Sequence, residues 1–434
     1  MDINQLTMQA RLASRKLAFI NQEAKNSALQ KIADTLLTQR EAIFSANHID
    51  LERSKTAGIA APLLKRLNFD QDKLRQVVDG LISLIHMPDP VGRTQLATRL
   101  DHDLDLYRVS CPIGVIGVIF ESRPDALVQI SGLCLKSGNA VLLKGGSEAM
   151  ETNRILAELI AAAGIEAGMP AGWLGLLETR NDVSQLLDRD REVDLLIPRG
   201  SNEFVRYIME HTHIPVLGHA DGVCHIYLDK NADAEMALRL TLDSKTQSVA
   251  VCNAVETVLI HSALVPKLLQ PLADSLRAAG VELFGCDRVC SLLGCKPVSH
   301  WHQEYLDYKI SLKIVDHLAD AITHINTYGS KHTDAIVTAD ETAARQFMLE
   351  VDAANVFWNC STRFSDGYRY GFGAEVGIST SKLHARGPVG LEGLLTYQYR
   401  LLGRGQIVAD YTSGRTEFIH EPIDHPYPLS SSGR

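Results

Sequence analysis

The chain has 434 residues, of which 45% are hydrophobic and 22% are charged, as in an ordinary soluble globular protein. This length predicts about two or three domains with sizeable cores. The formal net charge of -9, without a long basic run, argues against nucleic acid or an anionic membrane as the main partner, and no apolar stretch is long enough to span a bilayer.

The first part of the chain is predicted to be helical. Its apolar residues follow the spacing i, i+3, i+4, i+7, i+8 at Leu29, Ile32, Ala33, Leu36 and Leu37. Gly58 is expected to end this region, and a second helix is expected over residues 62–85. Residues 99–109 then alternate between leucine and aspartate, which predicts an antiparallel strand or hairpin outside the main sheet.

From residue 112 the pattern alternates between strand and helix. Continuous apolar runs predict strands at 115–120, 140–143, 174–177, 193–197 and 214–217, and Pro124 suits the first turn of a helix that runs to Lys136. Such alternation implies a doubly wound parallel sheet. A second alternating unit is expected over residues 225–372, and the tail from Tyr399, with short strands at 406–409 and 418–420, is expected to form an arm.

The cysteines point to a cytoplasmic protein with free thiols. Eight cysteines in so long a chain do not make a disulfide framework, and the N-terminus has neither the basic nor the apolar region of a signal peptide. Cys286, Cys290 and Cys295 cluster, but their spacing differs from the paired C-x-x-C of common zinc sites, so no metal is expected.

Cys252 is the candidate nucleophile. It follows the valine-rich triplet 249–251 and precedes Asn253 and a strand-like run at 255–260, so a loop at the mouth of a buried strand can aim the thiol at a substrate. The alternative is that Cys252 fills the core, since free cysteine is among the most buried residue types.

Two strand ends are candidate anion sites. The first reads Lys144-Gly145-Gly146-Ser147-Glu148 and the second Pro198-Arg199-Gly200-Ser201, and each leads from a strand into a helix. Glycines allow close approach, and helix N-termini favour anions, so the pair suggests an extended phosphate-bearing ligand such as a dinucleotide. The alternative for Lys144 is a solvated charge. The glycines of 371–377 do not form a Rossmann fingerprint, because their spacing and context differ.

Residues 315–336 carry the most specific resemblance. They read as a helix stopped at Tyr328-Gly329, a polar turn with His332, and a strand at 335–338. The string, together with the Cys252 region and residues 112–124, 222–229, 361–367 and 381–388, resembles the gamma-glutamyl phosphate reductase family of the aldehyde dehydrogenase superfamily. The alternative for His324 and His332 is a structural capping role.

The resemblance covers nearly the whole chain and implies an aldehyde dehydrogenase-like α/β fold with two doubly wound domains and a small β oligomerisation arm. It implies an NADP(H)-binding domain over 1–224, with 99–110 in the arm, and a catalytic domain over 225–372. Residues 373–398 would return to the cofactor domain, and 399–434 would complete the arm and tail. A homodimer or homotetramer follows from such bridging strands.

The family reduces L-glutamyl 5-phosphate with NADPH to glutamate 5-semialdehyde, phosphate and NADP, the second step of proline biosynthesis from glutamate. On this resemblance the Cys252 thiolate would displace phosphate and form a thioester, which accepts hydride more readily than a carboxylate does. The thiohemiacetal would then release the aldehyde.

The resemblance also assigns the other site residues. Ser122 and the backbone N–H of Cys252 would stabilise an oxyanion, with Asn253 counted among the catalytic residues. Arg123 and Arg363 would hold the phosphate and the α-carboxylate, unless they form structural ion pairs. The cofactor would contact Lys144, Gly145, Ser147, Gly200, Ser201 and Glu304, and a solvated loop carboxylate is the alternative for Glu304.

One departure from the wider superfamily narrows the reaction. Aldehyde oxidisers carry a glutamate that activates water near the segment 218–222, where this chain has none. This favours reduction over thioester hydrolysis, although His219 and Asp221 remain possible bases. The alternatives are an oxidative aldehyde dehydrogenase and a catalytically silent scaffold for the preceding glutamate 5-kinase, with which a transient contact is also expected.

Overall fold

The computed structural model describes residues 2–121, 123–200, 202–218, 221–372, 374–382 and 385–429. The chain divides into two compact units. Unit 1 holds the chain up to Leu217, residues 372–377 and the segment from Val389 onward; unit 2 holds Gly218–Gly371 and Ile378–Pro388. The short strands β14 (Gly377–Ser379) and β15 (Gly387–Val389) pair where the chain passes between the units.

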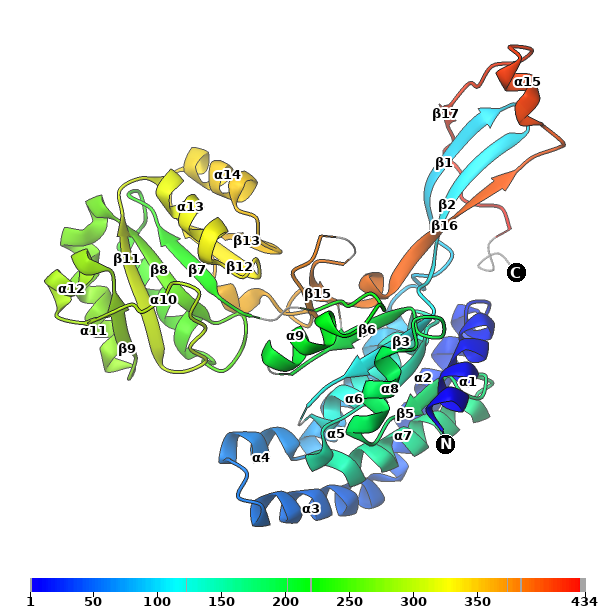
Figure 1. Cartoon of the computed structure of the whole chain (residues 1–434), viewed down its shortest axis with the longest axis horizontal. Coiled ribbons are helices and arrows are strands. Elements are labelled where there is room, and N and C mark those ends of the chain that lie inside the picture. The colour runs from blue at the N-terminus through cyan, green and yellow to red at the C-terminus, as the bar shows by residue number, and fades with distance from the viewer. Residues whose placement is uncertain are drawn as a thin grey trace. The chain divides into compact units, whose positions relative to one another are not determined.

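Helices dominate the start of unit 1 (Figure 1). They are α1 (Ile3–Leu17), α2 (Gln22–Thr38), α3 (Arg40–Thr56), α4 (Ala61–Leu67) and α5 (Gln71–His86). The prediction of one helix over 62–85 is wrong. Asn68 leaves the helical conformation, the backbone N of Phe69 donates to the side chain of Asn47 at 2.9 Å, and Asp70 caps α5 by accepting from the backbone N of Lys73 at 3.0 Å.

A four-stranded parallel sheet in the order β5-β4-β3-β6 forms the core of unit 1. Its strands are β3 (Val115–Ile119), β4 (Ala140–Lys144), β5 (Leu174–Leu176) and β6 (Leu195–Pro198), and they confirm four of the predicted strands. The fifth, at 214–217, is reduced to an isolated bridge between Leu196 and Val216. The helices of this part are α6 (Pro124–Lys136), α7 (Met150–Glu166), α8 (Arg180–Leu187) and α9 (Asn202–Glu210).

The arm is an antiparallel sheet in the order β16-β2-β1-β17. It consists of β1 (Thr94–Asp101), β2 (Leu104–Pro112), β16 (Leu395–Leu402) and β17 (Glu421–Pro422), so the predicted hairpin near 99–109 is confirmed. The predicted strand at 406–409 is wrong, since Val408–Thr412 form helix α15 and the backbone N of Ser413 donates to the carbonyl of Ala409. Residues 418–420 are not a strand either; β17 begins just after them.

Unit 2 is built on a seven-stranded parallel sheet in the order β10-β9-β11-β8-β7-β12-β13. Its strands are β7 (Cys224–Leu228), β8 (Val255–His261), β9 (Glu282–Gly285), β10 (Lys296–Pro297), β11 (Lys309–Val315), β12 (Thr333–Val337) and β13 (Asn355–Trp358). Its helices are α10 (Ala234–Thr246), α11 (Gln270–Ala278), α12 (Asp287–Leu293), α13 (Leu318–Tyr328) and α14 (Glu341–Glu350).

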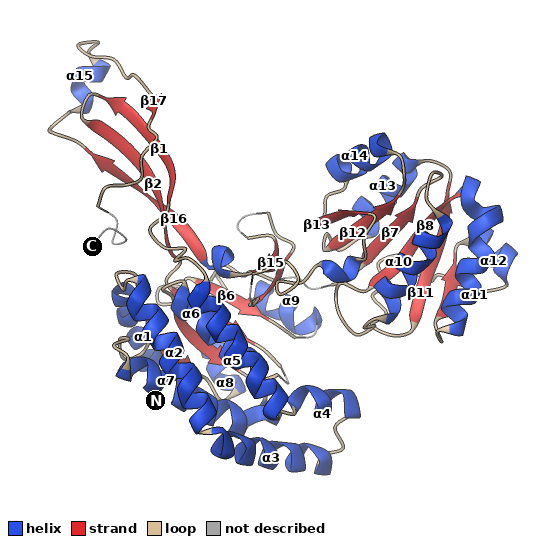
Figure 2. Cartoon of the chain, turned by 180° about the vertical axis from the view of Figure 1, so that it is seen from behind, coloured by secondary structure: helices blue, strands red, loops and turns tan. Residues whose placement is uncertain are grey.

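Helices cover both faces of this sheet (Figure 2), and the two faces bury separate apolar cores. Ile226 and Leu228 of β7 pack with α10, α11 and α12, whereas the alternate residue Tyr227 packs with α13 and α14. The predicted helix and strand within 315–336 are confirmed as α13 and β12.

Candidate functional site

The thiol loop, residues 246–255, joins α10 to β8 and carries Cys252. The side chain of Cys252 is half-buried, and a tight turn in which the backbone N of Ala254 donates to the carbonyl of Val251 at 3.0 Å presents it just before the strand. Because β8 itself is buried along Val255–Ile260, the loop is the point at which this part of the chain reaches accessible space. The thiol therefore lies where the sequence predicted, at the mouth of a buried strand.

Gly222 packs directly against the thiol loop. A Cβ added at Gly222 would lie 2.5 Å from the Cα and 2.7 Å from the Cβ of Cys252, a separation that real atoms do not tolerate. Any side chain at position 222 would displace the nucleophile. Within the segment 218–222, His219 lies outside the described residues, so its suggested role as a base remains a prediction.

The side chain of Cys224 contacts the thiol loop at Cys252, a contact that the sequence did not predict. Its Sγ donates to the carbonyl oxygen of Cys252 at 3.2 Å, and its side chain is fully buried. Burial raises the pKa of the Cys224 thiol well above its usual value, so this sulfur stays protonated and serves as a hydrogen-bond donor. In the sequence, this role of Cys224 is indicated only by its position two residues after Gly222.

The segment 361–365 holds the far side of the thiol loop. Oγ1 of Thr362, in the short 3-10 helix η4 (Thr362–Phe364), donates to the carbonyl of Asn253 at 2.7 Å, and Nδ2 of Asn253 donates to the carbonyl of Ser365 at 2.7 Å. The Asn253 side chain is 4% exposed and its Oδ1 has no hydrogen-bond partner within the described residues. Asn253 thus anchors the loop, and its catalytic role remains a prediction.

Arg363 follows in the same segment and lies close enough to Cys252 to interact with it electrostatically. Its Nε donates to Oε1 of Gln247, which lies in the thiol loop, at 2.9 Å. Burial lowers the pKa of the Arg363 guanidinium, the nearby charge of Arg369 acts in the same direction, and Cys252 acts in the opposite one. The structure therefore brings together a thiol and a guanidinium that are far apart in sequence.

Arg123 has a different environment, in unit 1. It stands at the N-cap of α6, and its Nη2 lies 2.9 Å from Oδ2 of the buried Asp125, which also pairs with Lys73 at 3.3 Å. This is the structural ion pair that was the alternative for Arg123, and its substrate role remains a prediction. Ser122 lies outside the described residues.

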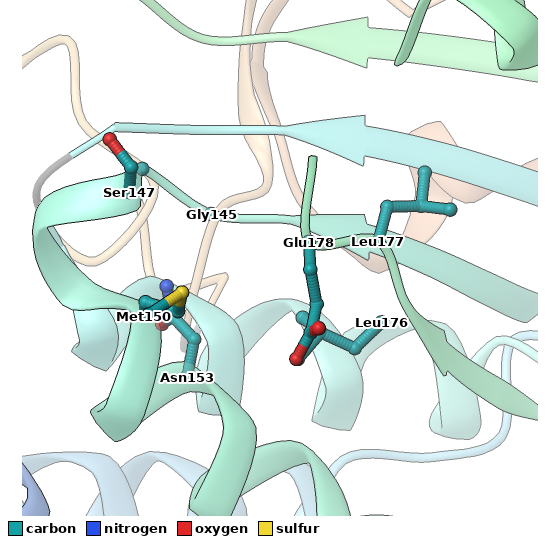
Figure 3. A pocket seen from close by; sticks show the side chains of 8 residues that line it. Gly145, Ser147, Met150, Asn153, Leu176, Leu177 and Glu178 are labelled. Atoms are coloured by element: carbon teal, nitrogen blue, oxygen red, sulfur yellow. The ribbon is translucent and has the colours of Figure 1, made fainter. Parts of the chain in front are cut away.

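A shallow cavity that is open to solvent lies at the end of β4 in unit 1, with about 230 Å³ of empty space when the solvent at its mouth is included (Figure 3). We call it the β4 cavity. Residues from the end of β4 and the start of α7 face residues at the end of β5 across it. Its lining consists of Gly145, Gly146, Ser147, Met150, Asn153, Leu176, Leu177 and Glu178.

Asn153 determines what the β4 cavity offers to a ligand. A Cβ at Gly145 would collide with the side chain of Asn153, so glycine at position 145 leaves room for that side chain. Oδ1 of Asn153 is buried without a hydrogen-bond partner within the described residues and can accept a hydrogen bond from a ligand. Lys144 is 8% exposed and donates to the carbonyl of Gly145, and its burial lowers the pKa of its ammonium group.

The N-terminus of α7 is already satisfied by a carboxylate that the sequence analysis missed. Asp50 of α3 is 0% exposed, and its side chain accepts from the backbone N of Thr152 at 2.8 Å and of Glu151 at 3.2 Å. Arg53, which pairs with Asp50, donates to the carbonyl of Ser147 at 3.1 Å. An anion at this strand end must therefore use donors that precede α7.

The second strand end lies at the same sheet as the first but is not its direct neighbour, because β3 stands between β4 and β6. A Cβ at Gly200 would lie 3.1 Å from Oε1 of Glu121. Burial raises the pKa of the Glu121 carboxyl, and the charge of Glu148, at the first strand end, raises it further. Both strand ends thus belong to one parallel sheet, as the sequence predicted, while Ser201 lies outside the described residues.

Glu304 and the cysteine cluster both belong to unit 2. Glu304 is half-buried on the loop between β10 and β11. Burial raises the pKa of Glu256, the second residue of β8, and the charge of Glu304 raises it further.

In the cysteine cluster, Sγ of Cys290 lies 3.6 Å from Sγ of Cys295. Among the described residues no group of three or more histidine, cysteine or carboxylate side chains is arranged to hold a metal. Nor does any helix of the described chain have the length and apolarity needed to cross a bilayer.

Comparisons with known proteins agree with this geometry. The profile of the aldehyde dehydrogenase family matches residues 1–283. The gamma-glutamyl phosphate reductase of Acetivibrio thermocellus is 57% identical over 99% of this chain and 100% of its own length, and that of Ruminiclostridium cellulolyticum is 59% identical over 98% and 99%. The crystal structure of gamma-glutamyl phosphate reductase from Thermotoga maritima superposes with a TM-score of 0.91 at 35% identity, covering 94% of this chain and 100% of that one.

Proposed function

The chain belongs to the gamma-glutamyl phosphate reductases of the aldehyde dehydrogenase family and is an oxidoreductase, and we propose that it reduces L-glutamyl 5-phosphate to L-glutamate 5-semialdehyde and phosphate with NADPH in proline biosynthesis. The observation that carries this proposal is the half-buried Cys252 thiol, held in a loop next to Arg363.

The thiol performs the first step. The Cys252 thiolate attacks the acyl carbon of the substrate, the bond from that carbon to the phosphate oxygen breaks, and a thioester forms as phosphate leaves. The Arg363 guanidinium near the thiol suits the departing phosphate or the α-carboxylate, because its planar fork pairs with such anions. Arg123 is proposed for the other anionic group.

The backbone amide of Cys252 and the hydroxyl of Ser122 are proposed to stabilise the oxyanion, with Asn253 keeping the loop in place. Bound NADPH supplies the hydride for the reduction. The resulting thiohemiacetal on Cys252 then collapses, which releases the aldehyde and restores the thiol. Because no glutamate stands in the segment 218–222, the carboxylate with which aldehyde oxidisers activate water is missing there, and His219 and Asp221 are the bases left in the segment.

The β4 cavity is proposed to hold the adenosine part of the cofactor. Gly145 and Ser147 line it, Lys144 precedes it, and the orphaned Oδ1 of Asn153 offers an acceptor to a hydroxyl or amino group. Gly200 and Ser201 are proposed near the pyrophosphate, and Glu304 near the nicotinamide ribose. A second candidate, oxidation of an aldehyde to a free acid, uses the same residues apart from a water-activating base.

Whether oxidation of the semialdehyde requires inorganic phosphate decides between these two reactions. Purified protein is given glutamate 5-semialdehyde and NADP, with and without inorganic phosphate, and NADPH and the acyl product are measured. We expect NADPH to form only when phosphate is present. Phosphate-independent production of free glutamate would show an oxidative aldehyde dehydrogenase, and no turnover at all would favour a scaffold that serves glutamate 5-kinase.

We propose that the enzyme is cytoplasmic and that it forms a homo-oligomer through the arm. β16 is the outer strand of its sheet, and it exposes Tyr397, Tyr399 and Leu401. Exposed apolar edge strands tend to pair with another chain. Light scattering of the wild type and of Tyr399→Lys, Leu401→Lys tests this: a monomeric wild type contradicts it, and a transient kinase contact would require a separate binding measurement.

A further inference from the structure

A buried ion pair closes the thiol loop at its base. Lys245 lies in the last turn of α10 and Glu256 is the second residue of β8, so the two flank residues 246–255. Nζ of Lys245 lies 2.7 Å from Oε2 of Glu256, and both side chains are 0% exposed. The other oxygen of Glu256 accepts from the backbone N of Leu306 at 3.2 Å, so neither carboxylate oxygen is left without a partner.

A β-bulge directs Glu256 toward this lysine. In the ladder between β7 and β8, Cys224 pairs with Val255 and His225 pairs with Thr257, which leaves Glu256 as an extra residue on β8. Bulges interrupt the alternation of a strand, redirect a side chain and occur next to active sites. The bulge begins three residues after Cys252, so the same irregularity that shapes the end of the loop also forms the ion pair.

Stability alone does not account for the pair. Burial raises the pKa of the Glu256 carboxyl and lowers the pKa of the Lys245 ammonium group, so burial opposes the two charges while their attraction to each other favours them. Apolar side chains of similar volume usually stabilise such a position as well or better. A buried ion pair with defined geometry is therefore better explained by a need for position.

The ion pair complements the contacts at the tip of the loop. There, Thr362 and Cys224 donate to the carbonyl oxygens of Asn253 and Cys252 at 2.7 and 3.2 Å. These bonds hold two peptide groups at the tip, but they do not fix the positions of the two ends of the loop, at α10 and at β8. The ion pair between Lys245 and Glu256 fixes those positions, because it joins the end of α10 to the start of β8.

We propose that Lys245 and Glu256 are positioning residues for the Cys252 thiol, acting by holding the two ends of its loop together through their ion pair. The proposal rests on the proposed function only in taking Cys252 as the nucleophile.

The test replaces the ion pair by an apolar pair. In the variant Lys245→Met, Glu256→Leu, kcat of the phosphate-dependent reaction is expected to fall about a hundredfold, as for a nucleophile misplaced by about 1 Å, with KM for semialdehyde and for NADP changed by less than about twofold. The melting temperature is expected to stay at or above the wild-type value. Iodoacetamide alkylation of Cys252 is followed over a pH series by mass spectrometry of the peptide that contains it. The pH at which the alkylation rate reaches half its maximum is expected to differ from that of the wild type.

Matched variants keep the test decisive. Lys245→Arg retains the ion pair and should keep most of kcat and the wild-type alkylation profile. Glu256→Gln removes the charge of the carboxylate and replaces the double variant if that one fails to fold. Lys25→Met removes another buried lysine, which pairs with Asp89 in unit 1, and should lower stability without changing Cys252 alkylation.

A folded double variant with wild-type kcat, or with reduced kcat and a wild-type alkylation profile, overturns the proposal. So does an equal change of the profile in Lys25→Met. Alkylation needs no substrate, so it decides the positioning role even if the wild type fails the phosphate assay, a result that would reject only the proposed function.

Discussion

The thiol loop and the β4 cavity are supported in different ways. The cavity is lined by residues between 145 and 178, at the ends of two adjacent strands of one sheet. The thiol loop is held by Gly222, Cys224, Glu256, Thr362 and Ser365, which come from distant parts of unit 2. A binding surface can be made from consecutive strand ends, whereas a nucleophile needs long-range contacts to keep one atom in place.

The two units differ in their buried histidines. Within the described residues, the buried histidines are His225, His324 and His332, and all belong to unit 2. Both units bury lysines and carboxylates, such as Lys25 and Asp50 in unit 1 and Lys245 and Glu256 in unit 2. The units should therefore respond differently to acid, since only histidine titrates just below neutral pH.

Removing the nucleophile should have the largest effect. Cys252→Ala is expected to lower kcat of the phosphate-dependent reaction by roughly 10⁴-fold or more, because the covalent route is lost. Steady-state NADPH formation measures it, with Cys290→Ala as the matched control that retains activity. Wild-type turnover in Cys252→Ala would contradict the assignment of the thiol loop as the catalytic element.

Crowding the loop should have the next largest effect. Gly222→Ala places a Cβ against the Cα of Cys252, so we expect kcat to fall about a hundredfold through misplacement of the thiol. Kinetics and thermal unfolding are measured together. In the control Gly80→Ala the new Cβ meets no atom within 4 Å, and this variant should keep full activity.

Acid should remove the contribution that neutral His324 makes to the stability of unit 2. Burial lowers the pKa of His324 to about 2, so the folded state keeps this imidazole neutral while the unfolded state takes up a proton as pH falls through its ordinary value. The stability from neutral His324 is thus fully present above pH 6.5 and is lost below it, by about 2 kcal/mol at pH 5.

Urea unfolding of the wild type and of His324→Gln from pH 7 to pH 5 measures this slope. The variant should lose part of the pH dependence. Equal slopes for the two proteins would mean that His324 does not contribute. Hydrogen exchange shows which unit unfolds first, and unfolding of unit 1 before unit 2 at pH 5 would contradict the expected difference between the units.

The smallest effect is expected at the cap of α7. Asp50→Ala removes the acceptor for the backbone N–H groups of Glu151 and Thr152, which should cost about 1–2 kcal/mol of stability. The helix start also lines the β4 cavity, so KM for NADP should rise by about tenfold, the equivalent of about 1.4 kcal/mol. The control Asp70→Ala removes the cap of α5 and should lower stability without changing that KM.

Local patterns predicted most of the framework. The buried runs of 115–120 and 140–143 read as strands because parallel strands are covered on both faces, and α6 begins and ends where Pro124 and Lys136 predicted. The error at 406–409 arose from a short helix, α15, whose hydrogen bonds are local, whereas the error at 62–85 arose where a tertiary contact overrides propensity. Asn47 holds the break between α4 and α5, and no pattern within residues 62–85 reports that contact.

The sequence by itself determined the two parallel sheets, the place of Cys252 before a buried strand, and the family, because hydrophobic periodicity and motif order are local properties of the chain. Only the tertiary structure decided which groups surround the thiol. Cys224, Arg363 and the Lys245–Glu256 ion pair reach Cys252 and its loop through folding, and a cap such as Asp50 lies about a hundred residues from the helix it serves. Burial makes these contacts strong, and burial is a property of the folded chain.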